Sequence, residues 1–124
     1  MPFILVVEDN DDVAPLEIAL ALLDHLQVKV VTNGRDALDI IQHNGGEMAA
    51  VITDLNVPLI DGFELIRAVR FHSMNPKLPV IVVSGYNDPE TQTRVRDLGA
   101  SAFFPKPYSP AAVCQTLEGL LHAP

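Results

Sequence analysis

Met48-Ala-Ala-Val-Ile-Thr-Asp54 is an apolar run that ends in a carboxylate, and a turn-rich segment, Leu55-Asn-Val-Pro-Leu-Ile-Asp-Gly62, follows it at once. Short apolar runs of this kind are typical of strands buried in a parallel sheet. Three similar runs also lead into polar side chains: Phe3–Val7 into Glu8 and Asp9, Pro79–Val83 into Ser84, and Ala102–Phe104 into Lys106. Because ligands bind outside the carboxyl ends of parallel strands, these side chains are expected to converge on one site.

The chain alternates such runs with stretches of helical periodicity. Expected strands are 3–7, 28–32, 49–53, 79–83 and 101–104, and expected helices are about 12–24, 34–43, 62–72, 88–98 and 109–121. Fivefold alternation favours a parallel sheet with helices on both faces. We therefore predict an α/β fold with a single doubly wound, five-stranded sheet, (βα)5 and flavodoxin-like. We choose the strand order 2-1-3-4-5, which brings the ends of the first and third strands together.

Local signals support the helix boundaries. Asn33 precedes the second helix, Asp61 can cap the third, and Asp88-Pro89 and Ser109-Pro110 are typical of helix starts. Gly99 is expected to end the fourth helix.

Composition restricts the classes of function. The 124 residues are 48% hydrophobic, enough for one domain with a real core. No apolar run approaches the roughly 18 residues of a membrane span. The net charge of −8 disfavours direct binding to nucleic acid or to an anionic membrane. The single cysteine, Cys114, agrees with a reducing compartment, so we expect a cytoplasmic protein.

Glu8, Asp9 and Asp54 together suggest a metal-assisted site. Clustered carboxylates repel each other unless a cation relieves them. Oxygen ligands without nearby His or Cys suit Mg2+. Asp54 could then also act as a nucleophile toward phosphorus, while Lys106 and Ser84 offer a cation and a hydroxyl to phosphoryl oxygens.

Residues 3–121 resemble a bacterial response-regulator receiver domain, the phosphoacceptor of two-component signalling, with a chemotaxis-regulator-like fold. The resemblance rests on four segments in order and at suitable spacing: VVEDN at Val6–Asn10, DLNVPLIDG at Asp54–Gly62, VVSG at Val82–Gly85 and GASAFFPKP at Gly99–Pro107. It implies a domain that accepts a phosphoryl group from a histidine-kinase phosphohistidine and then changes its binding surface.

The resemblance also implies roles for the acidic residues. Asp54 is the phosphoacceptor and a Mg2+ ligand. Asp9 binds Mg2+ directly, Glu8 binds it directly or through water, and the backbone carbonyl of Asn56 is the third protein ligand. Glu8 stands where Asp is commoner in the family, which favours the water-mediated role.

By the same resemblance, Lys106 is the motif lysine, followed by a Lys106-Pro107 bond that is cis in many members. Ser84, where Thr is commoner, is the switch hydroxyl, and Phe103 is the switch aromatic. Tyr86 could hang over the site and affect access of water.

Taken alone, each residue has a plainer interpretation. Glu8 and Asp9 could be a solvated acidic loop, Ser84 a strand-end hydroxyl and Lys106 a surface lysine. Phe103 and Phe104 could be core, with alternation placing them on opposite sides. The remaining assignments are Asp11 and Asp12 as cap and surface, Cys114 as a small buried residue, and His25, His43, His72 and His122 as surface residues.

The leading hypothesis is a receiver domain over 1–124 that is not a classical enzyme but assists its own phosphorylation and dephosphorylation. Its expected partners are a histidine kinase or phosphotransfer protein and a downstream protein at the face of the fourth helix, fifth strand and fifth helix. Phosphorylation-dependent dimerisation is left open. No output domain is expected in this chain, and both a stand-alone regulator and a piece of a longer protein remain open.

Two alternatives compete with it. One is a phosphatase of the haloacid-dehalogenase type, which also uses an Asp nucleophile and Mg2+. The other is a receiver-like interaction module that is not phosphorylated.

Overall fold

The computed structural model describes residues 2–9, 13–24, 26–44 and 46–122. Five strands alternate with five helices along these residues, as predicted. In chain order the elements are β1 (Phe3–Val7), α1 (Ala14–Ala21), β2 (Gln27–Val31), α2 (Gly34–His43), β3 (Met48–Asp54), α3 (Gly62–His72), β4 (Val80–Ser84), α4 (Pro89–Asp97), β5 (Ala102–Pro105) and α5 (Pro110–Leu121).

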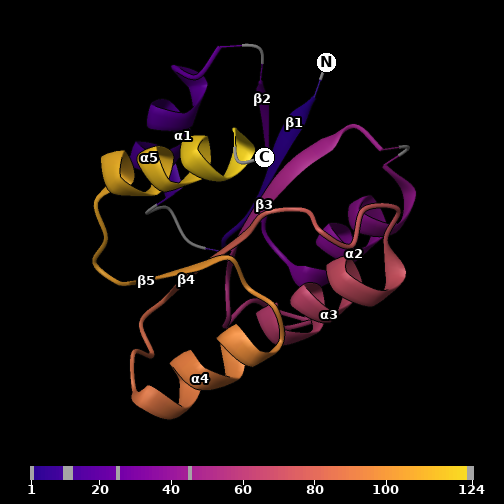
Figure 1. Ribbon diagram of the computed structural model, residues 1–124, viewed down its shortest axis with the longest axis vertical. Coiled ribbons are helices and arrows are strands. Elements are labelled where there is room, and N and C mark those ends of the chain that lie inside the picture. Colours follow the sequence, from indigo (N-terminus) through magenta and orange to yellow (C-terminus); the bar gives the residue numbers. More distant parts are fainter. Residues whose placement is uncertain (1, 10–12, 25, 45, 123–124) are drawn as a thin grey trace.

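The strands form one parallel sheet in the order β2-β1-β3-β4-β5, which confirms the predicted topology. Helices α1 and α5 cover one face of the sheet, and α2, α3 and α4 cover the other (Figure 1). All strands run the same way, so their carboxyl ends meet at one edge of the sheet. The register pairs Asp54 on β3 with Val83 on β4, which places Ser84 one residue further along that edge.

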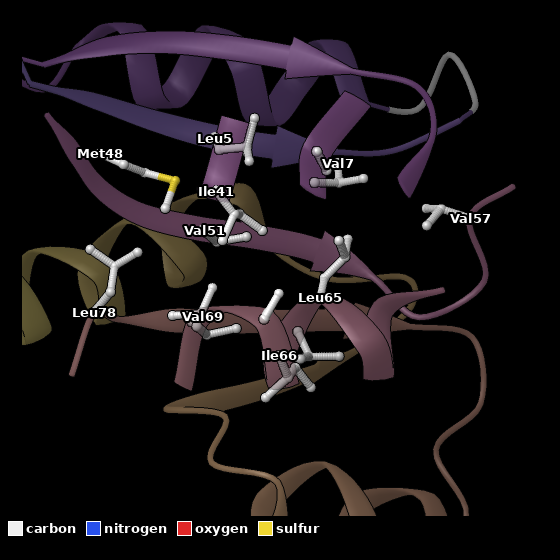
Figure 2. Packing of buried hydrophobic residues seen from close by; sticks show 14 of the residues in the cluster. Leu5, Val7, Ile41, Met48, Val51, Val57, Leu65, Ile66, Val69 and Leu78 are labelled. Carbon is white, nitrogen blue, oxygen red and sulfur yellow. The ribbon is translucent and has the colours of Figure 1, made fainter. Parts of the chain in front are cut away.

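The sheet separates two apolar cores. Alternate residues of β1 enter opposite cores: Leu5 and Val7 pack beneath α2 and α3, whereas Ile4 and Val6 pack beneath α1 and α5. Figure 2 shows the first of these cores, where strand residues face Leu65 and its neighbours on α3. Burial of the central strands on both faces gives the residues at their ends a rigid support.

Most boundaries differ from the predicted ones by one residue. The ranges 3–7, 34–43 and 62–72 match the prediction. The other observed ranges, with the predicted ones in parentheses, are 27–31 (28–32), 48–54 (49–53), 80–84 (79–83), 89–97 (88–98), 102–105 (101–104) and 110–121 (109–121). For the fourth and fifth helices the predicted first residues, Asp88 and Ser109, are the N-caps.

Helix α1 is shorter than the predicted 12–24. Asp11 and Asp12 lie outside the described residues, and the N-cap is Val13, whose side chain makes no capping hydrogen bond. At the other end, the backbone N–H of Leu23 donates to the carbonyl of Leu20 at 3.0 Å. Bonds between residues three apart tighten the last turn toward 3₁₀ geometry and so end the α-helix early.

The predicted side-chain caps of the other helices are observed. Asn33, Asp61, Asp88 and Ser109 each accept a hydrogen bond from the backbone N–H three residues later, at 2.9, 3.0, 3.0 and 3.2 Å. The hydroxyl of Thr91 also donates to Asp88, and this bond with the backbone bond lowers the pKa of that exposed carboxyl.

Candidate functional site

Asp54 is the last residue of β3, and its side chain is buried at the carboxyl edge of the sheet. Its Oδ1 atom accepts a hydrogen bond from the backbone N–H of Asn56 at 3.0 Å. The hydroxyl of Thr53 donates to the backbone oxygen of Asp54 at 2.8 Å. Because β3 lies between β1 and β4, the sheet fixes this carboxylate from both sides.

Lys106 joins Asp54 to Glu8. Its Nζ atom lies 2.5 Å from Oδ2 of Asp54 and 2.8 Å from Oε2 of Glu8. Only 4% of the Glu8 side chain and 9% of the Asp54 side chain are exposed, against 23% for Lys106. The three residues come from the ends of β1, β3 and β5, so the sheet brings them together as the sequence predicts.

The electrostatics of this trio follow from burial and proximity. Burial and the nearby charge of Asp54 raise the pKa of Glu8, and the hydrogen bond from Lys106 opposes this shift without cancelling it. Burial acts to lower the pKa of Lys106, but the bonds to Asp54 and Glu8 outweigh it, and that pKa is raised. Two carboxylates around one ammonium leave an excess of negative charge at the edge of the sheet.

Ser84 ends β4 and is fully buried. Its Oγ atom accepts a hydrogen bond from the backbone N–H of Tyr86 at 3.0 Å, and its carbonyl accepts one from the backbone N–H of Lys106 at 2.8 Å. The Lys106-Pro107 bond is cis. Ser84 therefore contacts both the lysine segment and the loop that leads to α4.

The segment after Asp54 is held by a residue whose role the sequence analysis did not recognise. The backbone N–H of Gly34, at the start of α2, donates to the carbonyl of Pro58 at 2.9 Å. A Cβ atom at position 34 would lie only 1.6 Å from the backbone oxygen of Ile60. Asn33-Gly34 is typical of a helix start, and a glycine at such a start is also a signal of close backbone approach.

The expected metal ligands are only partly gathered. Asp9 and Asn56 are exposed beside the buried carboxylates, and the backbone N–H of Asp9 donates to Oε1 of Glu8 at 3.1 Å. Within the described ranges, no three His, Cys, Asp or Glu side chains are grouped so as to hold a metal ion. The metal roles of Asp9 and of the Asn56 carbonyl therefore stay predictions.

Phe103 and Phe104 are half-buried and pack on opposite faces of β5, as alternation predicts. Phe103 also lines a hollow of about 200 Å³ between α4 and β5. Tyr86 is 60% exposed, and its predicted effect on water access stays untested.

The remaining singled-out residues lie away from this chemistry. Cys114 is buried, as predicted, and burial raises the pKa of its thiol. His43, His72 and His122 are exposed, as predicted, and His25 lies outside the described residues.

An open recess of about 540 Å³ adjoins the lysine. Its lining consists of Glu8, Pro15, Lys106, Pro107, Tyr108 and Pro110. Glu8 and Lys106 are thus reachable from the side of α1 and α5. Among the described residues, no helix is both long and apolar enough to cross a membrane.

The fold and this arrangement define a class of signalling domain, and comparison with known proteins identifies it. The family model of the response regulator receiver domain matches residues 4–118, so the chain belongs to the receiver-domain family of two-component response regulators. Phosphorylation, signal transduction and dependence on Mg2+ are typical of this family.

Relatives of several kinds carry the same domain. The two-component response regulator ORR11 of rice is 29% identical over 122 residues, covering 97% of this chain and 81% of the relative. The transcriptional regulatory protein PrrA of Mycobacterium tuberculosis is 31% identical over 121 residues, covering 97% of this chain and 50% of PrrA. The sensor kinase CckA of Brucella abortus is 32% identical over 121 residues, covering 95% of this chain and 12% of CckA.

Solved structures agree with these relatives. The chemotaxis response regulator CheY4 of Vibrio cholerae superposes with a TM-score of 0.83 at 26% identity, covering 97% of this chain and 98% of CheY4. The receiver domain of a signal transduction histidine kinase from Syntrophus aciditrophicus superposes with a TM-score of 0.82 at 28% identity, covering 98% of this chain and 90% of that domain. This similarity identifies a signalling domain. Receiver domains interact with histidine kinases and downstream effectors.

Proposed function

We propose that Asp54 is the phosphoacceptor of this receiver domain. In the reaction, the P–N bond of a phosphohistidine breaks and its electron pair stays on the imidazole nitrogen. A carboxylate oxygen of Asp54 forms the new P–O bond. The observation that carries the proposal is the position of Lys106, whose ammonium contacts both buried carboxylates, Asp54 and Glu8.

Each side chain of the site has a defined task in this proposal. Phosphoryl transfer depends on positioning and charge neutralisation more than on acid–base chemistry. The sheet and the N–H of Asn56 hold the Asp54 carboxylate in place. Lys106 carries a permanent positive charge next to it, ready to contact a phosphoryl oxygen.

The donor set fits Mg2+. Glu8, Asp9, Asp54 and the Asn56 carbonyl offer hard oxygen ligands, and the buried trio has an excess negative charge that a divalent cation would relieve. When bound, Mg2+ supplies further positive charge to the phosphoryl oxygens. The exposure of Asp9 and Asn56 leaves their oxygens available as ligands.

Ser84 and Phe103 are the proposed switch residues. Ser84 lies at the end of β4 and directly follows Val83, the residue that pairs with Asp54. Its hydroxyl is bonded to the loop before α4, through the N–H of Tyr86. Movement of this hydroxyl toward a phosphoryl group would release the Tyr86 N–H and change that loop. Phe103 adjoins the hollow beneath α4, so its ring can follow the change and alter the α4–β5–α5 face for a downstream protein. This is a two-state population shift.

The finer assignments belong to the same proposal. A histidine kinase or phosphotransfer protein is the phosphodonor, the domain assists its own dephosphorylation, and its location is the cytoplasm. The match over residues 4–118 supports treatment of the chain as one receiver domain. Nothing in the comparisons supports the haloacid-dehalogenase alternative.

The test is intact mass after incubation with acetyl phosphate and Mg2+, for the native chain and for Asp54→Asn. One added phosphoryl group that requires Mg2+ and is absent in the variant is the expected result. Fast hydrolysis could hide the adduct, so Mg2+-dependent binding of beryllofluoride is measured in parallel. If neither adduct forms, the proposal is wrong and the interaction module without phosphorylation takes its place.

A further inference from the structure

Arg70, near the end of α3, is bonded to the backbone of two loops: the loop that follows α3 and the loop that follows α4. Its Nε and Nη2 atoms donate to the carbonyl of Gly99 at 2.9 and 2.6 Å. Its Nη1 atom donates to the carbonyls of Leu78 at 2.6 Å and Pro76 at 3.1 Å. Among the residues that the structure describes, Arg70 forms no ion pair with a carboxylate, so this guanidinium serves the backbone of both loops.

The carbonyl of Gly99 belongs to the C-terminal cap of α4. The N–H of Gly99 donates to the carbonyl of Arg96 at 2.9 Å, and that of Ala100 to the carbonyl of Val95 at 3.1 Å, which is a Schellman motif. Gly99 has φ of +106°, and a Cβ atom there would lie 2.9 Å from Nε of Arg70. Both the backbone conformation and the arginine therefore require glycine at this point.

The same guanidinium adjoins the start of the two strands that lead to the site. The hydroxyl of Ser101 lies 3.5 Å from Nη2 of Arg70 and accepts the N–H of Val80 at 3.1 Å. The N–H of Ser101 donates to the carbonyl of Val80 at 2.7 Å. Arg70 thus holds the C-terminal end of α4 onto the region where β4 and β5 begin.

The rest of α4 is held far less firmly. Val95 is the buried residue of this helix, all of whose residues are described. Before Val95, residues 89–94 are exposed apart from a partly buried Thr91, and Arg94 stacks on the ring of Phe63 at 3.8 Å. At the other end, residues 85–88 between Ser84 and the helix are exposed. One end of α4 is therefore anchored, and the end nearer the site is loosely packed.

We propose that Arg70 is a positioning residue that makes Gly99 the fixed pivot of α4. A change at Ser84 then displaces the N-terminal end of α4 while the helix turns about its anchored C-terminal end. The displacement is concentrated on the surface beside the Phe103 ring and does not spread into the backbone of β5. This inference rests on the proposed function, because phosphorylation supplies the change at Ser84.

Hydrogen exchange measured by mass spectrometry tests the pivot. The native chain, Arg70→Met and Arg67→Met are each measured with and without Mg2+ and beryllofluoride. Arg67→Met is the matched control, because it removes the same charge from the same helix. Arg67 is exposed, and its ion pair with Glu64 is a long one, at 3.8 Å. The informative amides are Gly99, Ala100 and Ser101, which carry the cap and the start of β5.

In the native chain and in Arg67→Met, beryllofluoride should alter exchange over 84–97 and leave 99–101 within about twofold. In Arg70→Met, we expect exchange at 99–101 to rise about tenfold without ligand, because charge-assisted bonds are lost. We also expect the beryllofluoride response to extend into 99–101. A purely structural role would raise exchange equally with and without the ligand, leaving the extent of the response unchanged.

The outcomes separate this inference from the proposed function. If the native chain responds to beryllofluoride and the response of Arg70→Met stops at the same residue, the pivot is wrong and phosphorylation stands. If the native chain does not respond, both fail together. Should Arg70→Met not fold, Arg70→Lys replaces it, since lysine keeps the charge but lacks the fork that holds both loops.

Discussion

A Cβ atom at position 62 would lie 2.5 Å from the backbone oxygen of Asp54. The N–H of Gly62 also donates to the carbonyl of Leu55 at 2.9 Å. Helix α3 thus begins in direct contact with the strand end that carries the proposed phosphoacceptor. The position of the carboxylate and the start of α3 cannot vary independently.

Gly62→Ala should therefore be strongly destabilising. We expect its free energy of unfolding to fall by about 1–3 kcal/mol, because the added methyl group must push apart two backbone segments. Gly119→Ala is the control. Position 119 lies within α5 with open space around an added Cβ, and alanine there should raise the free energy of unfolding by about 0.5–1 kcal/mol. Urea unfolding followed by circular dichroism measures both, and destabilisation of both variants alike would contradict the contact.

Lys106→Met should make stability depend more strongly on pH. Without the ammonium, Glu8 and Asp54 face each other unpaired, so the free energy of unfolding at pH 7.5 should fall by about 1–3 kcal/mol. This is less than the roughly 3–5 kcal/mol for a fully buried pair, because Lys106 is 23% exposed. At pH 5 the loss should be smaller, since the raised pKa of Glu8 means that this carboxylate is charged in fewer molecules at pH 5 than at pH 7.5.

The raised pKa of Lys106 determines how stability changes at high pH. A raised lysine pKa stabilises the fold at every pH below the ordinary value of 10.5, and the stabilisation is lost only at higher pH. Thermal unfolding in EDTA across pH 5–9 measures the loss in Lys106→Met, and an extension of the scan above pH 10.5 follows the stabilisation by the native lysine. Lys77→Met, at an exposed lysine, is the control and should show neither. An equal loss at pH 5 and 7.5 would count against the charge explanation.

Asp54→Asn should lower the pKa of Glu8. Burial and the charge of Asp54 both raise this pKa, so the variant should remove part of the shift and leave the part due to burial. Because the pKa of Glu8 is raised in the folded state, this residue destabilises the protein as the pH rises from the ordinary glutamate pKa of 4.5. The destabilisation should be smaller in the variant. Carbon-13 NMR titration of the Glu8 carboxyl in EDTA measures the midpoint. The exposed Asp97→Asn is the control, and a midpoint unchanged in Asp54→Asn would contradict the coupling.

Ser84→Ala should separate metal binding from switching. Mg2+ affinity should stay within about twofold of the native value, because the hydroxyl bonds to Tyr86 and is not a proposed ligand. The beryllofluoride-induced NMR shift of Phe103 should largely disappear. Ser84→Thr keeps the hydroxyl and should retain the response, although its methyl group must enter a fully buried position. Full retention of the Phe103 response in Ser84→Ala would remove Ser84 from the switch.

Much of the fold could be predicted from local pattern. The apolar runs, the caps at Asn33, Asp61, Asp88 and Ser109, and the strand–helix alternation are properties of neighbouring residues, and each proved correct within a residue or two. Helix α1 was the exception. Its last turn tightens through backbone hydrogen bonds between residues three apart, and its leucine-rich sequence does not indicate this change.

The convergence of Glu8, Asp54 and Lys106 could also be inferred, since parallel strands place their carboxyl ends on one edge of the sheet. The sequence by itself thus determined the topology, the family and the convergence of the side chains proposed to react. Only the tertiary structure decided that one ammonium bridges both acids, that Gly34 and Gly62 leave room for the segment after Asp54, and that Arg70 holds Gly99 from 29 residues away. In these contacts, residues far apart in the sequence bring individual atoms within a few ångströms of each other. A pattern of polarity and propensity along the chain carries no information on such distances.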